Sequence, residues 1–147
     1  MIKTKITEED SRKIVELGEV FMKEGRFRDH TYDPEGVWRI LEATVRFPNR
    51  FFVAYDEDFK GLALMGISQH YFSTYKWATD FAFFVTPEHR GGTLAVRLLR
   101  EAEKWAKENG AQEITILHNT GINTDKAGRF FNGFGYETKG HIFTKEL

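Results

Sequence analysis

A chain of 147 residues with a formal net charge of -1 is long enough to hold one hydrophobic core, and it offers no extended basic surface for nucleic acid. Hydrophobic residues make up 41% of the chain and charged residues 29%, which is typical of a folded protein. The absence of cysteine excludes disulfides, thiolate metal sites and a cysteine nucleophile, and no apolar run approaches the ~20 residues that span a bilayer. We therefore expect a single cytoplasmic domain over residues 1–147.

Two helices are predicted before any strand. Thr7 begins the sequence Thr-Glu-Glu-Asp, which resembles a capping box, and apolar residues follow at helical spacing from Ile14 to Phe21. This first helix is expected to run to about Gly25. Asp33-Pro34 then begins a second helix, and the sequence Phe-Pro-Asn at 47–49 ends it.

Three short strands come next. Their sequences are FFVAY (51–55), GLALMGIS (61–68) and ATDFAFFV (78–85), all rich in β-branched or aromatic residues. Turn residues at 56–60 and 73–76 separate them. Because the links are short, we expect hairpins and an antiparallel meander.

A long amphipathic helix follows the third strand. Its apolar residues recur at helical spacing and form one face that can pack on a sheet: Ala95, Leu98, Leu99, Ala102, Trp105 and Ala106. The strand EITIL (113–117) comes after it, and a right-handed crossover makes this strand the parallel neighbour of Phe81–Val85. A short helix over 124–131 and a last strand HIFTKEL (141–147) complete an α/β fold with a mixed sheet.

The pair Gly91-Gly92 stands directly before the long helix. A helix N-terminus carries unpaired N–H groups and a partial positive charge, and residues without side chains let an anion approach the main chain there. The sequence is neither a P-loop nor a dinucleotide-binding fingerprint. The alternative is a tight strand-to-helix turn that binds nothing.

The residues around this pair resemble a known loop. The segment Val85-x-Pro87-Glu88-His89-Arg90-Gly91-Gly92-x-x-Ala95 is similar to the acetyl-CoA pyrophosphate loop of the GNAT superfamily of N-acetyltransferases, which reads Arg/Gln-x-x-Gly-x-Gly/Ala. Arg90 and Ala95 match, whereas Thr93 stands where the family usually has glycine. The segment from Asn123 to Tyr136 resembles the family's second signature, with its Asn displaced by one position. The order of predicted elements matches over nearly the whole chain.

The resemblance implies a GNAT-type sheet that is mostly antiparallel, with a central βαβ crossover and helices on both faces. It implies acetyl-CoA as co-substrate and requires no metal. Backbone N–H groups of the loop would bind the pyrophosphate, the strand Phe83–Val85 would hold the pantetheine, and the Val85 N–H would polarise the thioester oxygen. The residues expected at the co-substrate are Phe84, Val85, Arg90, Gly91, Gly92, Thr93, Leu94, Ala95, Asn123 and Phe131.

Two residues are candidates for the catalytic base. Asp80 lies on the strand where the family often carries Glu or Asp, although a shift of one residue would turn it onto the wrong face as a solvated carboxylate. His118 ends the strand EITIL, where a purely structural hydrogen bond is the alternative. Phe131 occupies the position at which the family commonly has a Tyr acid.

The predicted function is an N-acetyltransferase that moves acetyl from acetyl-CoA to a primary amine by direct attack in a ternary complex. The acceptor, a small-molecule or peptide amine, cannot be read from the sequence. A catalytically silent acyl-CoA-binding or partner-binding module is the alternative, and Phe131 and Thr93 favour it. We expect neither a membrane nor nucleic acid as partner, and the sequence leaves a homodimer open.

Overall fold

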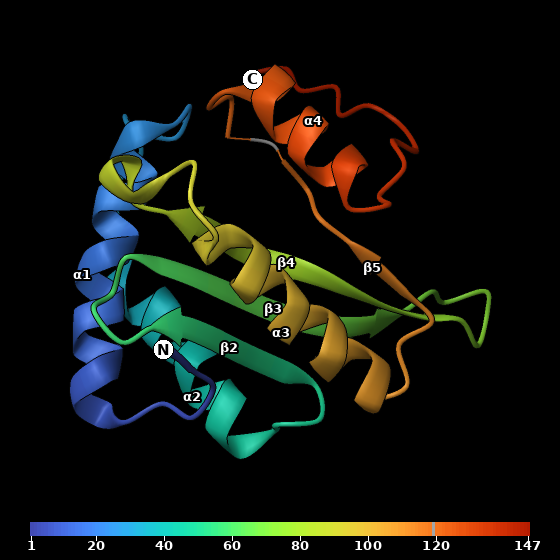
Figure 1. Ribbon diagram of the computed structural model, residues 1–147, viewed down its shortest axis with the longest axis horizontal. Coiled ribbons are helices and arrows are strands. Elements are labelled where there is room, and N and C mark those ends of the chain that lie inside the picture. The colour runs from blue at the N-terminus through green and yellow to red at the C-terminus, as the bar shows by residue number, and fades with distance from the viewer. Residues whose placement is uncertain (119) are drawn as a thin grey trace.

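The computed structural model describes residues 1–118 and 120–147. Its elements, in chain order, are β1 (Ile2–Lys3), α1 (Glu8–Glu24), α2 (Pro34–Arg46), β2 (Phe51–Asp56), β3 (Gly61–Gln69), β4 (Lys76–Val85), the 3-10 turn η1 (Pro87–His89), α3 (Leu94–Glu108), β5 (Glu113–Thr115) and α4 (Thr124–Gly133). The strands form one sheet in the order β1-β2-β3-β4-β5, crossed by α3 in Figure 1. Within the described residues, none of the helices is long and apolar enough to cross a membrane.

The two N-terminal helices begin where the sequence predicts. The Thr7 hydroxyl accepts a hydrogen bond from the Asp10 N–H at 3.1 Å, and the Asp33 carboxylate accepts one from the Gly36 N–H at 3.1 Å. Each side chain satisfies one of the N–H groups that a helix start leaves unpaired. Pro34 occupies the first turn of α2, where a missing N–H costs nothing.

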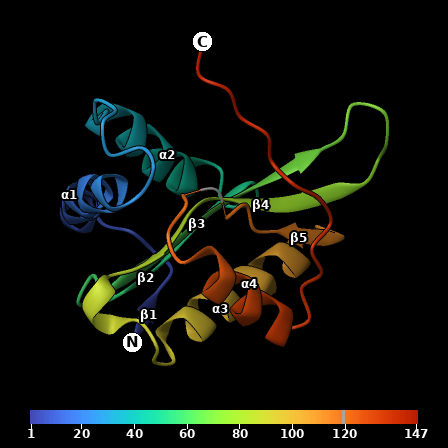
Figure 2. The same cartoon turned by 90° about the horizontal axis from the view of Figure 1, so that it is seen from above.

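Helices cover both faces of the sheet, as predicted. α1 and α2 lie on one side and α3 lies on the other, with α4 on the α3 side (Figure 2). Under α1 and α2, the fully buried Ile14, Leu41 and Tyr55 form one part of the core. Under α3, Met65 and Leu98 form the other part, where the rings of Phe52 and Trp105 stack at 5.0 Å.

The predicted meander and the parallel pair are confirmed, but the parallel register is not the predicted one. β2, β3 and β4 pair antiparallel, whereas β4 and β5 pair in parallel from Trp77 with Glu113 to Thr79 with Thr115. The expectation that Phe81–Val85 lies beside β5 is therefore wrong. Leu64 pairs with Ala82 and Met65 with Asp80, so that Phe81 is an extra residue in β4. Such a bulge bends its strand, and pairing with β5 ends just before it.

The ends of the chain differ from the prediction as well. β1 has two residues, too short to give a pattern, and it pairs with the end of β2. The predicted strand over 141–147 is wrong: these residues form no strand, and Figure 2 shows the segment running away from the sheet. Ile142 is 54% exposed and Phe143 91% exposed. A strand needs a neighbouring edge to pair with, and α4 ends in a Gly135 turn (φ 88°) that leads the chain elsewhere.

Candidate active site

A cleft of about 530 Å³ lies where β4 and β5 part. Its walls are formed by β4 and the loop after it, the start of α3, the segment after β5, α4, and the end of α1 with the turn that follows. All but two of the predicted site residues line this cleft: Asp80, Phe84, Val85, Arg90, Gly91, Gly92, Ala95, His118, Asn123 and Phe131. Thr93 is exposed at the N-cap of α3, and the Leu94 side chain packs in the core.

The C-terminal half of β4 presents unpaired backbone groups to the cleft. The Thr86 N–H donates to the Lys60 carbonyl across the hairpin at 2.8 Å. Since polar groups alternate along a strand, those of Phe84 face β3, and those of Phe83 and Val85 face the edge that β5 leaves open. The side chain of Phe84 packs its ring on that of Phe21 in α1, with centroids 4.6 Å apart. An extended ligand could therefore pair with β4 as an additional strand does.

The loop after β4 exposes further N–H groups. Gly91 has a φ of 89°, a conformation that favours glycine, whereas Gly92 lies outside this region. A Cβ at Gly92 would meet nothing within 4 Å. In the described part of the chain, no hydrogen bond occupies the N–H groups of residues 91–93, and the first N–H groups of α3 have no partner within the helix. This arrangement can accept an anion at the main chain.

Arg90 points inward and not toward this anion position. Its Nε donates to the Val85 carbonyl at 2.9 Å, and its two terminal nitrogens form a bidentate pair with the Glu24 carboxylate, one of them at 2.7 Å. The guanidinium also lies over the Phe84 ring at 5.6 Å. Arg90 therefore fixes the loop to the end of α1, and the Val85 carbonyl is already taken.

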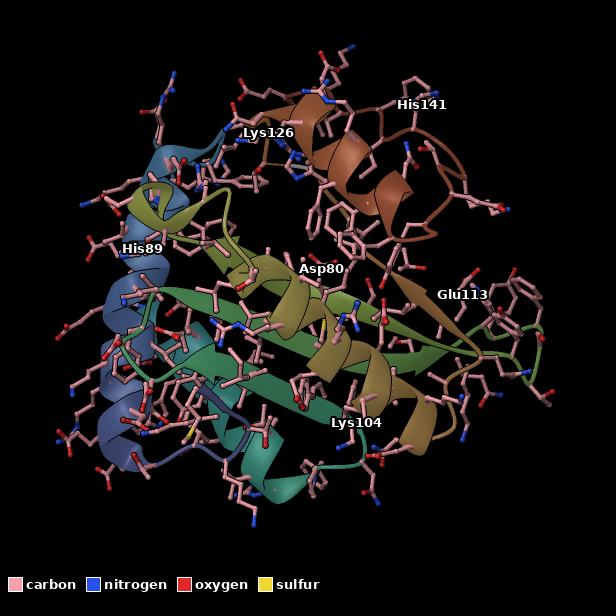
Figure 3. All side chains as sticks on the ribbon, viewed as in Figure 1. Asp80, His89, Lys104, Glu113, Lys126 and His141 are labelled. Atoms are coloured by element: carbon pink, nitrogen blue, oxygen red, sulfur yellow. The ribbon has the colours of Figure 1, made fainter. Side chains whose placement is uncertain are left out.

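Asp80 and His118 come together at the point where the strands part. The Leu117 N–H donates to the Asp80 carboxylate at 2.8 Å, and Figure 3 shows Asp80 on the side of β4 that faces α4. Burial raises the pKa of Asp80 above its ordinary value of 3.8, and the hydrogen bond from Leu117 and the charge of His118 only partly offset this effect. The buried Nε2 of His118 has no hydrogen-bond partner within the described residues.

The α4 wall of the cleft is aromatic. The Phe131 ring meets Phe83 edge-on, with centroids 5.9 Å apart, so Phe131 lies beside the open edge of β4. Tyr136 does not line the cleft. Its hydroxyl donates to Glu103 of α3 at 2.8 Å, and burial, more than this contact, raises the pKa of the phenol. Neither ring offers the cleft a free proton donor.

The Acetyltransferase (GNAT) family model matches residues 15–136, which is most of the chain. The chain belongs to the GNAT acetyltransferase family. The open β4 edge and the glycine loop described above are thus parts of a GNAT domain, and the resemblance drawn from the sequence is confirmed.

Solved GNAT structures share the fold across the full length. An acetyltransferase from Trypanosoma brucei superposes with a TM-score of 0.73 at 13% identity, covering 100% of this chain and 99% of that chain. Glucosamine-6-phosphate N-acetyltransferase from Arabidopsis thaliana gives 0.71 at 13%, covering 100% and 99%. An aminoglycoside acetyltransferase from an uncultured soil metagenomic sample, in complex with sisomicin, gives 0.73 at 19%, covering 99% and 96%. Among curated proteins, none matches the sequence.

Several residues of this GNAT cleft were not expected from the sequence. They come from the end of α1, the turn after it, the segment after β5, and α4: Phe21, Phe27, Ile116, Ile122, Lys126 and Phe130. Lys126 lies in the first turn of α4, three residues after Asn123, and this spacing could have indicated a cation beside the second signature. The α1 residues had no such signal, because only the folded chain brings α1 to the loop. In the described part of the chain, no group of three or more His, Cys, Asp or Glu could hold a metal ion.

Proposed function

We propose that this GNAT protein is an N-acetyltransferase that moves the acetyl group of acetyl-CoA to a primary amine by direct attack in a ternary complex. The observation that carries this proposal is the open edge of β4, which leads straight into a glycine loop with accessible N–H groups. The edge and the loop lie end to end along one cleft. An extended chain that ends in a pyrophosphate fits this combination.

The described residues suit acetyl-CoA. The Phe83 backbone groups would hold the pantetheine, the Val85 N–H would remain for the thioester because Arg90 occupies only the Val85 carbonyl, and the N–H groups from Gly91 into α3 would hold the pyrophosphate. The open space at Gly92 admits the phosphate oxygens. Lys126 supplies a cation on the opposite wall.

The proposed chemistry needs few protein groups. A C–N bond forms between the amine and the thioester carbon, the C–S bond breaks, and the amine proton leaves while the thiolate takes one up. The Val85 N–H would donate to the oxygen that becomes negative. Asp80 would accept the amine proton, because burial raises its pKa toward the working range of a base.

The lack of a free tyrosine hydroxyl among the described residues of the cleft favours the second candidate function, a catalytically silent acyl-CoA-binding or partner-binding module. Phe131 has no hydroxyl, and the Tyr136 hydroxyl is bound to Glu103. A thiolate leaves without a dedicated acid more easily than an alkoxide does, since its conjugate acid is stronger. Tight co-substrate binding without turnover of any amine would indicate a catalytically silent acyl-CoA-binding or partner-binding module. The cytoplasmic location and a homodimer stay predictions from the sequence.

The proposal is tested first at the glycine loop. Gly92→Val should lower the affinity for acetyl-CoA by about tenfold or more, because the branched side chain blocks charge-assisted hydrogen bonds from the main chain. Its melting temperature should hardly change, since a Cβ there meets open space. Calorimetry with acetyl-CoA and a spectrophotometric assay for released thiol with a panel of amines measure binding and transfer.

Two matched variants complete this test. Gly140→Val makes the same change at an open position outside the cleft and should alter nothing. Gly91→Ala should destabilise the fold by about 1 kcal/mol because of its positive φ. Equal acetyl-CoA affinity in wild type and Gly92→Val would overturn the assignment of the loop.

A further inference from the structure

A second cavity of about 220 Å³ lies between α1, α2 and the sheet. It shares Phe21, Phe81, Ala82 and Phe84 with the large cleft, so the same four residues line both spaces. The second cavity is therefore next to the part of β4 at which we propose the acetyl group is transferred.

The bulge in β4 builds this wall. Because Phe81 is the extra residue, both it and the following Ala82 lie toward α1 and α2: the Phe81 ring is 6.1 Å from that of Phe51, and Ala82 packs against the core under these helices. Gly66 in β3 makes room for the ring, since a Cβ there would lie 2.7 Å from it. The bulge and Gly66 thus place Phe81 on the side of the sheet that faces α1 and α2.

The second cavity has an apolar lining. Among the described residues around it, none carries a charged side chain. The hydroxyl of Tyr32 is its one polar side-chain group, and this hydroxyl already donates to the Val15 carbonyl. A second ammonium group, a phosphate or a row of sugar hydroxyls would lose its hydration here without gaining a partner.

We propose that this cavity holds the body of the acceptor, and that the acceptor is a primary amine carried on an apolar chain or ring of about eight carbons. The inference rests on the proposed acetyl transfer. A dry apolar cavity of about 150 Å³ can hold a benzene molecule, so 220 Å³ has room for a phenyl ring with a two-carbon link.

The first experiment compares acceptors with the wild-type protein at saturating acetyl-CoA. In the series from propylamine to decylamine, kcat/KM should rise about fourfold for each added methylene until the cavity is full near eight carbons. 2-Phenylethylamine should be among the best acceptors. Spermidine, glucosamine 6-phosphate and sisomicin should be poorer than octylamine by about 10²-fold or more.

The second experiment changes the volume of the cavity. Val37→Phe in α2 fills it and should lower kcat/KM for octylamine at least tenfold, with the affinity for acetyl-CoA unchanged. Val45→Phe makes the same substitution on the same helix at a position 65% exposed and outside both cavities, and it should have no effect. Leu17→Ala enlarges the cavity and should move the optimum to an amine two or three carbons longer, which mere loss of stability would not do.

Each outcome decides one of the two proposals. Acetylation of spermidine, the amino sugar or sisomicin but not of the apolar amines would overturn this inference and leave the proposed reaction standing. An optimum that stays at the same length in Leu17→Ala would also overturn it. If acetyl-CoA binds and no amine of either class is acetylated, the proposed reaction fails, and this inference fails with it.

Discussion

Asp80 keeps a carboxylate at a position where burial favours the neutral acid. The Leu117 N–H holds it there, across the point at which β4 and β5 part. Asn can accept the same hydrogen bond but cannot take up a proton. Asp80→Asn should therefore stay folded while kcat/KM falls by about 10²-fold or more. The wild-type pH profile should show an acid limb above pH 3.8 that Asp80→Asn lacks, because the base must be ionised to act.

The raised pKa of Asp80 also contributes to the dependence of stability on pH. The folded protein holds the Asp80 proton more tightly than the unfolded chain does, so between pH 3.8 and the raised pKa its stability falls as pH increases. The Asp80→Asn variant lacks this loss, so its melting temperature relative to wild type should be higher at pH 8 than at pH 4.

The rate profile also distinguishes the two candidate bases. If the acid limb of kcat/KM persists in Asp80→Asn and is lost in His118→Gln, the base is His118.

Single residues also show what the sequence could and could not predict about the site. Gly91 and Gly92 were predictable, because a strand, a glycine turn and a helix follow one another within a few positions. The pair between Arg90 and Glu24 joins residues 66 positions apart, and no local pattern indicates it. The face of Asp80 depends on the bulge at Phe81, and strand alternation alone does not reveal a bulge.

At the scale of elements, local signals were enough for most of the fold. Helix caps, the turn sequences and the apolar face of α3 each depend on neighbouring residues, and the structure confirms the elements they predict. The last strand was predicted from its composition, but a strand also needs a partner edge. Residues 137–147 find none in this structure.

Deleting residues 138–147 is expected to change the melting temperature by no more than about 2 °C, because exposed segments contribute little to stability. The deletion removes Lys139 and so breaks its ion pair with Glu137, but both side chains are about three-quarters exposed and the pair contributes little. Tyr136 and its hydrogen bond to Glu103 remain in the shortened chain. Differential scanning calorimetry of both chains checks this. A loss of many degrees would mean that the segment pairs with a strand edge in solution, as its composition suggested.

At the scale of the whole molecule, the two candidate binding sites lie on opposite faces of the sheet and share residues of β4. The cleft proposed for acetyl-CoA opens on the side of α3 and α4, and the apolar cavity lies between the sheet and the helices α1 and α2. Phe21 and Phe84 contribute to both. Two substrates would thus meet at the open edge of β4, one from each face of the sheet, which suits a ternary complex and requires no covalent enzyme intermediate.

The pair between Arg90 and Glu24 joins these two sides, because Glu24 ends the helix whose Phe21 lines both sites. Glu24→Gln should keep the shape of the side chain but weaken this link. The dissociation constant of octylamine is measured by titration with and without CoA, and the ratio of the two values reports the coupling between the sites. This ratio should be closer to one in Glu24→Gln than in wild type. The same ratio in both proteins would show that this pair does not connect the sites.

This connection bears on the order in which the substrates bind. If acetyl-CoA binds as proposed and orders the loop at Arg90, the pair with Glu24 would also order the end of α1, and the acceptor would then meet a site that needs less rearrangement. By thermodynamic reciprocity, the acceptor must tighten the binding of the co-substrate by the same factor. Initial-rate kinetics should therefore favour an ordered mechanism with acetyl-CoA first, and Glu24→Gln should shift it toward random order.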